Sequence, residues 1–560
     1  MEELLEHSGA LIRYDWGLFF KLLLIVLVIL GMLTAIYDRY VQRSNQILIN
    51  YPLIGRLRYL FHLLRAPMRQ YFGDETYYDL SEKVEWVNRA AYDKPLYYSF
   101  ALSKPSHTGV TRFVHANKVL NTDEVDPHFS VTFGARHPCP FTARSIIGRS
   151  AMSDGAISPE ATQAFARGAF MGGFPINTGE GSLTTNFLTT HSCGGDLSKR
   201  RYLEIHRGTF FARGVYTMTR LLFNQEIATN LYRDLILTKE VETYNFDPKE
   251  RAFFRVDWSR PLEDFPEQVD DIPDIVFQIG SGLYGVRDVQ GNFDPERYRK
   301  VMRFCKMTEI KIAQGAKQSG GKLLACKVSE AVAWYRGVPA HKDIISPNRF
   351  PYADTPEALF DFVGVLQKLA HKPVGIKIVI STQDNFEPFA DLLAERIAGG
   401  APFPDFITLD GADGGSGAAP LETMYRTGRS IEESLDIVTA ALDKRGIREH
   451  VRLIASDKVL TPDYVVALLC RGADFVNIAR GFMISAGCIR AKECSGANGR
   501  ACPVGIATME RSKRSKFLIA QKAHNVASYH RNLCQGVRAT MAIMGKQKIS
   551  ELSKMDLILS

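Results

Sequence analysis

Hydrophobic residues form two different patterns along this chain. Residues 18–37 read LFFKLLLIVLVILGMLTAIY, a run of twenty residues whose only charge is Lys21. From about residue 270 onward, short apolar runs alternate with segments whose apolar positions recur at helical spacing. The first pattern is long enough to cross a lipid bilayer. The second is typical of folds in which strands and helices alternate.

The short apolar runs are expected to be buried parallel strands. They cover residues 274–282, 309–317, 375–381, 405–415, 451–458 and 474–481. A predicted helix over residues 355–370 lies between two of them and places on one face Leu359, Phe362, Val363, Leu366 and Leu369. Such repeated units predict a (β/α)8 barrel of the TIM type, with an open doubly wound sheet as the alternative. No GxGxxG motif follows a first strand, which disfavours a Rossmann fold.

The N-terminal run is expected to be a single transmembrane helix. Lys21 lies near one end, where its side chain can reach the interface. Acidic residues precede the run and basic residues cluster after it, which predicts that the bulk of the chain faces the cytoplasm. A signal peptide would have a basic start and a small-residue cleavage site, which this segment lacks. A buried core helix is the other alternative.

Composition narrows the class of protein. The chain has 560 residues, of which 46% are hydrophobic, and a formal net charge of +8. This mild and mixed charge argues against a dedicated nucleic-acid binder and is compatible with an anionic substrate or membrane surface. The nine cysteines are too sparse, and odd in number, for a secreted disulfide framework, so a reducing compartment is expected.

Glycine-rich loops follow two of the predicted strands. Residues 410–420, DGADGGSGAAP, contain four glycines that let backbone N–H groups approach a phosphate. Residues 479–487, ARGFMISAG, form a second such loop, and in barrels a phosphate often lies between the last loops. Lys377 lies inside the apolar strand GIKIVI, where a lysine needs a partner. A flavin ring and a buried ion pair are the two alternatives.

Three cysteines lie close together in CIRAKECSGANGRAC, residues 488–502. A metal cluster, a disulfide and a set of buried structural thiols all agree with such a group. The expected reducing compartment favours metal binding.

Residues 189–270 do not follow the alternating rhythm and are expected to be an insertion. Residues 207–237 look helical and rich in aromatic residues and arginine, and residues 245–271 read as loop. The helical part is expected to form a lid or a membrane-surface helix, with a passive decoration as the alternative.

Seven motifs in order along the chain resemble the FMN-binding domain of glutamate synthase. They are SAMSDGAISPEA (150–161), NTGEG (177–181), QIGSGLYGV (278–286), EIKIAQGAK (309–317), ISP (345–347), DGADGGSGAAP (410–420) and GCIRAKECSGANGRACPVGIAT (487–508). The resemblance covers about residues 130–510. It is greatest to the shorter, single-domain members of the family, which share YPLIGRLRYLF (51–61) and MRQYF (68–72) before the barrel and a YHRN-like segment (529–532) after it.

The resemblance implies FMN, a [3Fe-4S] cluster and chemistry on 2-oxoglutarate. It assigns catalysis and substrate binding to Lys317, Gln314 and Glu180. It assigns the flavin ring to Met152, Ser153, Gln278, Ser281 and Lys377, and the flavin phosphate to Asp413, Gly414, Gly415, Gly481 and Phe482. It assigns the cluster to Cys488, Cys494 and Cys502.

Several positions depart from the family pattern. The second gap between the cluster cysteines is seven residues instead of four, which puts the cluster type in doubt. Two acids that follow NTGEG in the family are absent, and Asp457 stands where glycine is usual, so an acid could disturb a phosphate loop. No amidotransferase segment precedes the predicted barrel, so ammonia is expected to come from elsewhere.

The sequence therefore predicts an anchor over residues 1–45, a pre-barrel segment over 46–130 and the barrel over 131–545. The expected reaction is reductive amination of 2-oxoglutarate, or a similar dicarboxylate, to glutamate, with electrons from a ferredoxin or an NAD(P)H-dependent reductase. A flavin and iron–sulfur electron-transfer or redox-sensing subunit without its own substrate is one alternative. A 2-hydroxy-acid oxidase is another, although the late strands offer Arg480 and no histidine base.

Overall fold

The computed structural model of the chain describes residues 16–61, 81–96, 112–188, 200–223, 225–236, 244–315, 317–318, 321–412, 414, 423, 426–496 and 499–558. The chain divides into two compact units, Met1–Glu75 and Thr76–Ser560. The second unit carries all the residues predicted to do chemistry.

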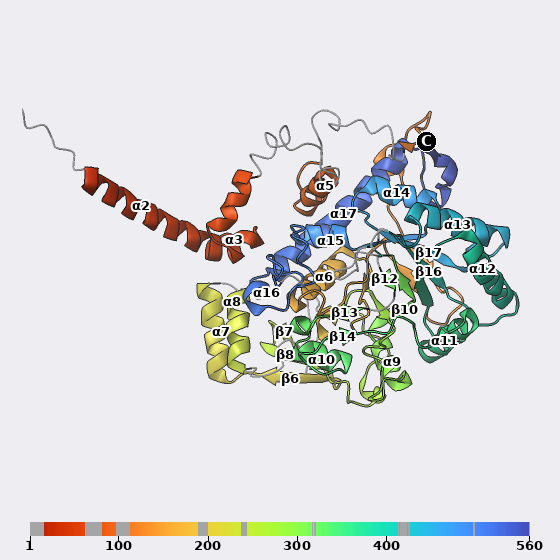
Figure 1. The fold of residues 1–560 in the computed structure, drawn as a ribbon, viewed down its shortest axis with the longest axis horizontal. Coiled ribbons are helices and arrows are strands. Elements are labelled where there is room, and N and C mark those ends of the chain that lie inside the picture. Colours follow the sequence, from red (N-terminus) through yellow and green to blue (C-terminus); the bar gives the residue numbers. More distant parts are fainter. Residues whose placement is uncertain are drawn as a thin grey trace, which may run out of the picture. The chain divides into compact units, whose positions relative to one another are not determined.

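The first unit is built on one long apolar helix, α2 (Trp16–Ile36), which continues into a π-helical turn over Tyr37–Val41 (Figure 1). The most apolar 18-residue window of Phe19–Val41 is unburied, with a hydropathy of 2.7, whereas Asp38 near the end of this segment is buried. A helix this long and apolar agrees with either a membrane anchor or a signal sequence. The short helix α3 (Gln46–Asn50) follows, and Arg56 pairs with Asp38 at the end of the apolar segment.

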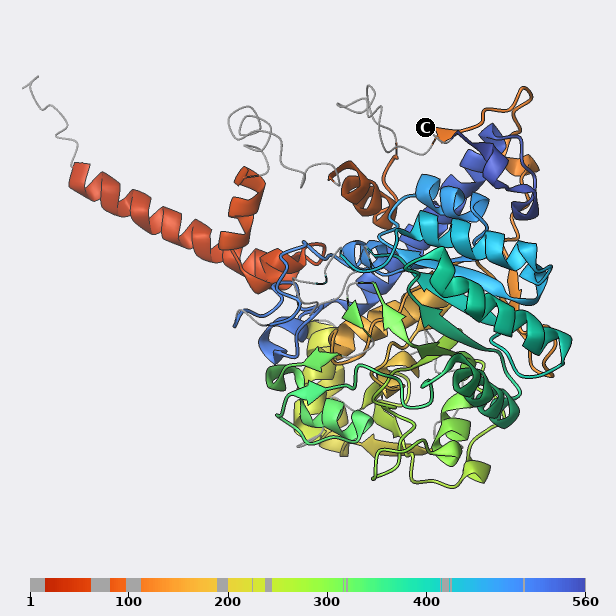
Figure 2. The same ribbon diagram turned by 45° about the vertical axis from the view of Figure 1, so that its right-hand side comes forward.

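Eight parallel strands in the second unit close into a barrel (Figures 1 and 2). They are β4 (Ile147–Arg149), β5 (Ile176–Asn177), β9 (Ile275–Ile279), β10 (Cys305–Lys311), β15 (Val374–Ile378), β16 (Phe406–Asp410), β17 (Arg452–Asp457) and β18 (Phe475–Ile478). Their order around the ring is β10-β15-β16-β17-β18-β4-β5-β9. The closed ring confirms the predicted (β/α)8 barrel and excludes the open sheet.

A hairpin closes the amino-terminal end of the barrel. Its strands are β2 (Val131–Phe133) and β3 (Phe141–Ala143). Phe133 packs edge to face against Phe406 and Phe475, which begin β16 and β18, at centroid distances of 5.5 and 5.8 Å. The hairpin buries this end in one apolar cluster. The opposite end, where the strands finish, is therefore the end available for a site.

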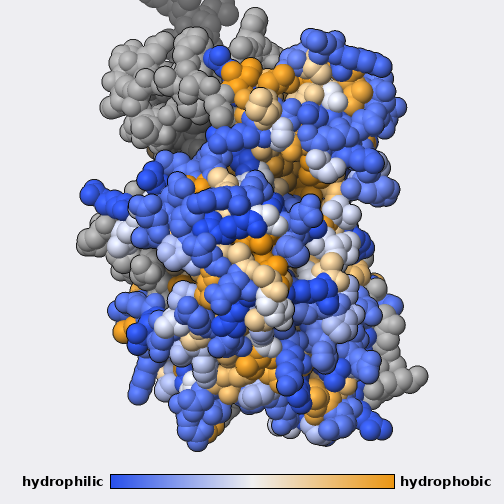
Figure 3. All heavy atoms as spheres, turned by 90° about the vertical axis from the view of Figure 1, so that its right-hand side faces the viewer, coloured by the Kyte–Doolittle hydropathy of each residue, from blue (hydrophilic) through white to orange (hydrophobic). Residues whose placement is uncertain are grey.

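Helices cover the outside of the barrel. They are α5 (Ser81–Ala91), α6 (Pro159–Gly172), α9 (Pro295–Met302), α10 (Glu330–Arg336), α11 (Pro356–Ala370), α12 (Gln383–Ala398), α13 (Ile431–Lys444), α14 (Pro462–Cys470), α15 (Arg480–Ser485), α16 (Arg511–Arg514) and α17 (Ile519–Ile543). The predicted start of α11 is confirmed, because Thr355 Oγ1 accepts from the Ala358 N–H and Pro356 takes the first turn. Figure 3 shows the side on which α11, α12 and α13 lie, where hydrophilic residues cover most of the surface.

The strand expected over residues 309–317 is wrong in its bounds. β10 ends at Lys311, and the chain then forms a small antiparallel hairpin of β11 (Ala313–Gln314) and β12 (Lys317–Gln318). The polar side chains at 314 and 317 suit a hairpin outside the barrel better than a buried strand. Three further antiparallel pairings join β1 (Arg112–Phe113) to β19 (Leu557–Ile558), β13 (Lys322–Leu323) to β14 (Ile344–Ile345), and β2 to β3.

The insertion lies between β5 and β9 and has a small core of its own. It contains β6 (Leu203–Arg207), a helical hairpin of α7 (Phe210–Leu222) and α8 (Gln225–Ile236), β7 (Asn245–Asp247) and β8 (Ala252–Val256). The three strands form one antiparallel sheet in the order β6-β8-β7. The helical expectation for 207–237 is thus largely confirmed, whereas the loop expected over 245–271 is wrong where β7 and β8 lie. AFFRV in β8 is an apolar run that is buried at four of its five positions: Phe253 packs in the cluster with Tyr232, and Ala252 and Phe254 pack in a second cluster on the other face.

Candidate active site

Charged side chains gather towards the carboxyl ends of neighbouring barrel strands. Lys377 on β15 pairs with Asp410 on β16, Nζ to Oδ1 at 2.9 Å, and both side chains are buried. Oδ2 of Asp410 accepts from the backbone N–H of Gly315 at 2.8 Å. Burial opposes the charge of Lys377, but Asp410 and Glu309 outweigh it, so the pKa of Lys377 lies above its usual value. Lys377 therefore stays cationic within a buried ion pair.

Glu309 on β10 is the centre of a second buried set of polar groups. Its carboxylate accepts from Asn177 Nδ2 at 2.8 Å and from Gln278 Nε2 at 2.6 Å. Its other oxygen accepts from Thr408 Oγ1. All four side chains are buried. These bonds join β5, β9, β10 and β16 in one polar layer, and they engage the amide nitrogen of Gln278, a residue assigned to the flavin ring.

Glu180 connects the NTGEG segment to the end of β10. Its Oε1 pairs with Lys311 Nζ at 3.1 Å. Its Oε2 is buried and has no hydrogen-bond partner among the described residues. A Cβ at Gly280 would lie 2.6 Å from this oxygen, so the loop after β9 approaches it closely only because residue 280 is glycine. A buried acceptor without a donor is costly unless water or a ligand supplies one, so Glu180 is placed to receive a donor.

Arg149 ends β4, and its guanidinium carbon lies 5.6 Å from the ring centre of Phe165 in α6 and 5.8 Å from that of Phe187. Its Nη1 donates to the carbonyls of Ser150 at 3.0 Å and Met152 at 3.2 Å. Its Nε and Nη2 are buried and have no acceptor in the described part of the chain. Burial lowers the pKa of Arg149 to about 9, and Asp154 opposes this shift. Met152 and Ser153 are partly exposed beside it. A flavin ring has nitrogen and oxygen acceptors along one edge, so these residues fit that group.

The segments assigned to the flavin phosphate follow β16 and β18. A Cβ at Gly414 would lie 2.6 Å from Asp410 Oδ2, so this close approach requires glycine. Gly481 and Phe482 are buried in α15, and the Phe482 ring stacks on Phe174 at 4.9 Å. Phe482 is thus a core side chain, and its backbone alone remains for a phosphate. Asp413 and Gly415 lie outside the described residues.

Asp457 places an acid against this glycine loop, as its departure from the family pattern suggested. It ends β17, and a Cβ at Gly411 would lie 3.3 Å from its Cγ. Tyr464 donates to Glu432 at 2.7 Å and to Asp457 at 3.4 Å. Burial and these two acids raise the pKa of Tyr464. A phosphate near Gly411 would therefore meet the negative charge of Asp457.

The residues assigned to catalysis and substrate binding follow β5 and β10, and Ser281, assigned to the flavin ring, follows β9. Gln314 and Lys317 pair across the β11–β12 hairpin, and Gln314 is partly buried. The side chain of Lys317 is not among those described. Ser281, which follows β9, is buried and donates to the carbonyl of Pro347 in the ISP motif. Motifs far apart in the sequence therefore meet at one end of the barrel.

The three late cysteines lie on the loop between α15 and α16. Cys488 and Cys494 are partly buried, and Cys502 is buried. Burial raises the pKa of Cys488 to about 11 and also raises the pKa of Cys494, and the nearby thiol of Cys502 adds to both shifts. In the described residues, no group of three metal-ligating side chains is close enough to hold a metal ion. The assignment of these thiols to an iron–sulfur cluster therefore stays a prediction.

Two further residues border the cysteine loop. A Cβ at Gly496 would lie 3.7 Å from the Sγ of Cys326, an exposed cysteine after β13. The neighbouring Lys327 is buried, and its Nζ donates to the carbonyls of Cys494 and Ala156. Burial lowers the pKa of Lys327, while Cys494, Cys502 and Cys326 oppose the shift. The loop thus has a buried cation beside its thiols, which suits thiolate ligands.

Sequence reasoning missed several of these residues, namely Arg149, Glu309, Lys311, Cys326, Lys327 and Asp410. Glu309 and Lys311 gave the same signal as Lys377, a charge within an apolar strand. Cys326 and Lys327 gave no such signal, because their neighbours in the cysteine loop are more than 160 positions away in the chain. Only the fold brings these segments together.

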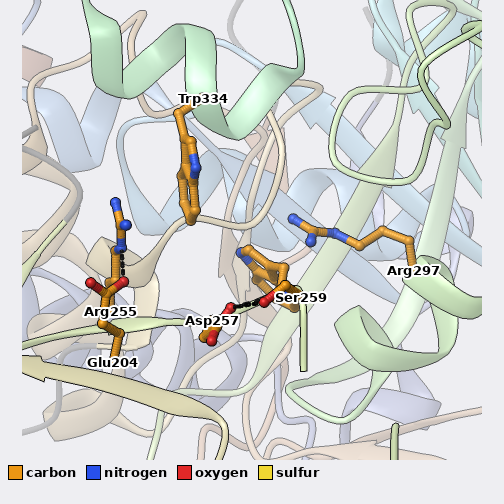
Figure 4. Close-up of a pocket in the computed structure, with 7 residues that line it drawn as sticks. Glu204, Arg255, Asp257, Ser259, Arg297 and Trp334 are labelled. Carbon is orange, nitrogen blue, oxygen red and sulfur yellow. Dashed lines mark hydrogen bonds and ion pairs between the residues drawn. The ribbon is translucent and has the colours of Figure 1, made fainter. Parts of the chain in front are cut away.

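A separate cavity of about 440 Å³ lies where the insertion meets α9 and α10 (Figure 4). Trp334 points into it from α10, Arg297 faces it from α9, and Arg255 pairs with Glu204 across β6 and β8 at 2.6 Å. Asp257 is bonded to Ser259 at its rim. Of the residues assigned to flavin, substrate or cluster, none that the structure describes lines this cavity. Its two carboxylates are already bonded within the chain, so it differs chemically from the barrel site.

Among solved structures, the chain is similar to the flavin-binding domain of flavocytochrome b2 from baker's yeast. The two are 13% identical with a TM-score of 0.40, over 85% of this chain and 79% of that one. A mandelate oxidase mutant is 12% identical with a TM-score of 0.38, over 87% of this chain and 94% of that one.

Sequence comparison gives nearer relatives. The glutamate synthase large subunit-like protein YerD of Bacillus subtilis is 30% identical, over 92% of this chain and 89% of that protein. The archaeal-type glutamate synthase [NADPH] of Dehalococcoides mccartyi is 31% identical over 42% of this chain and 43% of that protein. The ferredoxin-dependent glutamate synthase of Cyanidium caldarium is 30% identical over 52% of this chain and 17% of that protein. The chain thus spans less than half of these last two relatives. The family model described as the conserved region in glutamate synthase matches residues 111–547, so the chain belongs to the glutamate synthase family.

Proposed function

We propose that this protein is a membrane-anchored, FMN- and iron–sulfur-dependent oxidoreductase that converts 2-oxoglutarate and ammonia to glutamate. Membership of the glutamate synthase family and the relative that matches most of the chain support an oxidoreductase. The observation that carries the proposal is the set of charged side chains near the carboxyl ends of the strands, where Arg149 and Glu180 have buried polar atoms with no hydrogen-bond partner among the described residues. Buried polar atoms of this kind need water or a ligand as a partner.

The chain's own residues have separate roles in this proposal. Lys317 and Gln314 bind the dicarboxylate, because a cation and an amide suit carboxylate oxygens. Glu180, fixed by Lys311, accepts a hydrogen bond from ammonia or from the amino group that forms. FMN, when bound, supplies the hydride chemistry. Its ring would be held by Met152, Ser153, Gln278, Ser281 and Lys377, and its phosphate by Asp413, Gly414, Gly415, Gly481 and Phe482.

Electrons enter through an iron–sulfur cluster in this proposal. Cys488, Cys494 and Cys502 would hold it, and Lys327 would offset their negative charge. The donor is a ferredoxin or an NAD(P)H-dependent reductase, since the names of two relatives mention NADPH and ferredoxin. The ammonia comes from another protein or from solution.

Turnover by the full chain tests the proposal. We expect acid extraction of anaerobically purified protein to release about one FMN per chain. With 2-oxoglutarate, ammonium and a reduced donor, the protein should form glutamate. Glu180→Gln should retain FMN and lose at least about a hundredfold in turnover, whereas Glu296→Gln on the exposed surface of α9 should change neither. Release of FAD, or of no flavin, contradicts the cofactor.

The cluster has its own test. Cys494→Ser should abolish the visible absorbance of the cluster and its paramagnetic signal, and it should leave FMN bound, since the flavin residues lie on other loops. Cys139→Ser, at an exposed cysteine far along the chain from this loop, is the matched control. Wild-type protein prepared without oxygen that contains neither iron nor sulfide would show instead that these are structural thiols.

The anchor is proposed as a single pass with the barrel in the cytoplasm. Reporter fusions placed after residue 50 should read cytoplasmic, because basic residues follow the apolar helix. A reporter that is exported, or a chain that is cleaved after the apolar run, contradicts the anchor and favours a signal sequence.

A second candidate is a redox subunit without its own substrate. It is favoured by one observation, that Lys377 and Gln278 are already bonded to carboxylates of the chain itself. Under this candidate, the flavin would be reduced and reoxidised by protein partners, and 2-oxoglutarate with ammonium would not reoxidise it. The turnover assay above separates the two candidates directly.

A further inference from the structure

Helix α7 of the insertion has two different faces. One face packs on its neighbours through Ala212, Tyr216 and Thr219, which are buried. The other face exposes large apolar side chains, whose exposed fractions are 88% for Phe210, 75% for Phe211, 60% for Met218, 77% for Leu221 and 69% for Leu222. Phe223, directly after the helix, is 63% exposed. This face is called the α7 apolar face below.

The five exposed side chains within α7 form one stripe. At 3.6 residues per turn, positions 210, 211, 218, 221 and 222 fall within an arc of about 120°. Single exposed apolar residues are common on soluble proteins, but a contiguous group of this size marks an interaction surface. The stripe is not needed by the insertion's own core, which is formed by the opposite side of α7 with Tyr232 and Phe253.

The charge of α7 indicates what covers the stripe. Phe210–Leu222 contains no acidic residue, and its two arginines, Arg213 and Arg220, are both exposed. On the helix they lie about 60–80° beyond Phe210, along one edge of the stripe. An apolar face with basic residues along its edge is the pattern of a helix that lies in the plane of a membrane interface. Two copies of this face would bring like charges together, so a second copy of the chain fits less well.

We propose that α7 lies on an anionic lipid bilayer, with the α7 apolar face in the boundary between headgroups and acyl chains. Arg213 and Arg220 then contact lipid phosphates. This proposal rests on the proposed anchor only because the anchor would bring the chain close to a bilayer. The apolar and basic contacts with the lipids come from α7 itself. The insertion is thus a second point of membrane contact, and the relevant partner is a lipid surface.

Photo-cross-linking in the full chain tests this directly. Phe211 is replaced by p-benzoylphenylalanine, which keeps an aromatic side chain, and the protein is reconstituted in vesicles of phosphatidylcholine with about 30% phosphatidylglycerol. Irradiation should give a lipid adduct at residue 211, detected by mass. The same replacement at Val289, 93% exposed on the loop between β9 and α9, is the matched control and should give none. A third replacement at Phe20, within the apolar helix, reports on the anchor alone.

Each outcome decides one point. A lipid adduct at 211 without one at 289 supports the proposal. No adduct at 211, or an adduct to protein there, overturns it, whether that protein is a second copy or the same chain. A lipid adduct at residue 20 without one at residue 211 supports the anchor and overturns the α7 contact. A lipid adduct at residue 211 without one at residue 20 overturns the anchor and supports the α7 contact.

Charge provides a second measurement. Arg213→Gln with Arg220→Gln should reduce the adduct yield at residue 211 in anionic vesicles by up to about fivefold per arginine. In vesicles of phosphatidylcholine alone, the two proteins should give equal yields. If the variant and the parent also gave equal yields in anionic vesicles, that result would overturn the arginine–phosphate contact. Thermal melting of the variant should match that of the parent, since both arginines are exposed.

Discussion

Helices α11 and α7 are both amphipathic and similar in length, yet they use their apolar faces in opposite ways. α11, with 15 residues, buries Leu359, Phe360, Phe362, Val363 and Leu366 between the barrel and its neighbours. α7, with 13 residues, buries small or polar-tipped side chains and turns its large apolar ones outward. Amphipathic spacing therefore shows that a helix has an apolar face, and it does not show what covers that face.

The same contrast holds for charge. On the barrel side, ion pairs such as Lys377–Asp410 are buried where the strands end. In the insertion, Arg207 and Glu250 pair on the surface, with side chains 46% and 21% exposed. The barrel isolates charge from water, and the insertion presents charge and apolar area to its surroundings. The predictions below test this contrast.

The largest effect is expected from breaking a barrel ion pair. Lys377→Met leaves Asp410 buried without its cation, and removing one partner of a buried pair costs about 3–5 kcal/mol. Urea unfolding of the full chain in detergent measures the loss. Arg207→Met, which breaks the surface pair of the insertion, is the control and should cost less than about 1 kcal/mol. Similar losses of stability for the two variants would show that the buried pair contributes no more to stability than the surface pair does.

The next largest effect is expected from truncating a leucine side chain that is buried in one helix and exposed in the other. Leu366→Ala in α11 removes a fully buried side chain and should cost about 2–5 kcal/mol. Leu222→Ala in α7 makes the same chemical change at a residue 69% exposed, and unfolding in detergent-free buffer should change by less than about 0.5 kcal/mol. A large loss at Leu222 in that buffer would mean that the α7 apolar face is covered by protein, contrary to the membrane proposal.

The sequence predicted the barrel well because its later strands are apolar runs, such as residues 375–381 and 451–458, whose burial is intrinsic to their composition. It missed β4 and β5, which have only three and two residues, because runs this short have no detectable period. The residues of the candidate site also divide into those that the local sequence indicates and those that only the fold reveals. Lys377 was found from its apolar neighbours, while Arg149 and Lys327 became visible only when distant segments met. For the helical insertion, the sequence left a lid, a membrane-surface helix and a passive decoration open, because nothing local distinguishes a covered apolar stripe from an exposed one.

Acid should weaken the barrel through His530, a buried residue of α17. Its Nε2 lies 2.8 Å from Ser145 Oγ and its ring stacks on Phe174. Burial lowers its pKa from the usual value to about 3. The unfolded chain therefore binds a proton between about pH 6.5 and pH 3 that the folded chain excludes, so this contribution is complete above pH 6.5 and is lost as the pH falls.

The predicted slope is about 1.4 kcal/mol per pH unit for this one group. His530→Phe keeps an aromatic ring and removes the titration, so its stability relative to wild type should improve by that amount per unit as the pH falls from 6 to 4. Unfolding curves at several pH values measure the difference. The control, His206→Gln in the insertion, replaces a histidine that is 42% exposed and should give no comparable trend. An unchanged difference between wild type and His530→Phe across that range would contradict the buried neutral histidine.

The smallest effect compares one glycine in each helix. Gly214 in α7 has no atom within 4 Å of the place where a Cβ would be, so Gly214→Ala should add about 0.5–1 kcal/mol by lowering the entropy of the unfolded chain and raising helix propensity. Gly364 in α11 faces Pro402, whose side-chain carbons would lie 2.6 Å from a Cβ, so Gly364→Ala should destabilise by about 1–3 kcal/mol. The same change from glycine to alanine is therefore expected to raise the stability of the protein in α7 and to lower it in α11. In anionic vesicles Gly214→Ala should also keep its lipid contact, because a methyl group on the α7 apolar face adds area that suits the acyl boundary. Loss of stability at Gly214 would show that this face is packed against protein, and α7 would then resemble α11 after all.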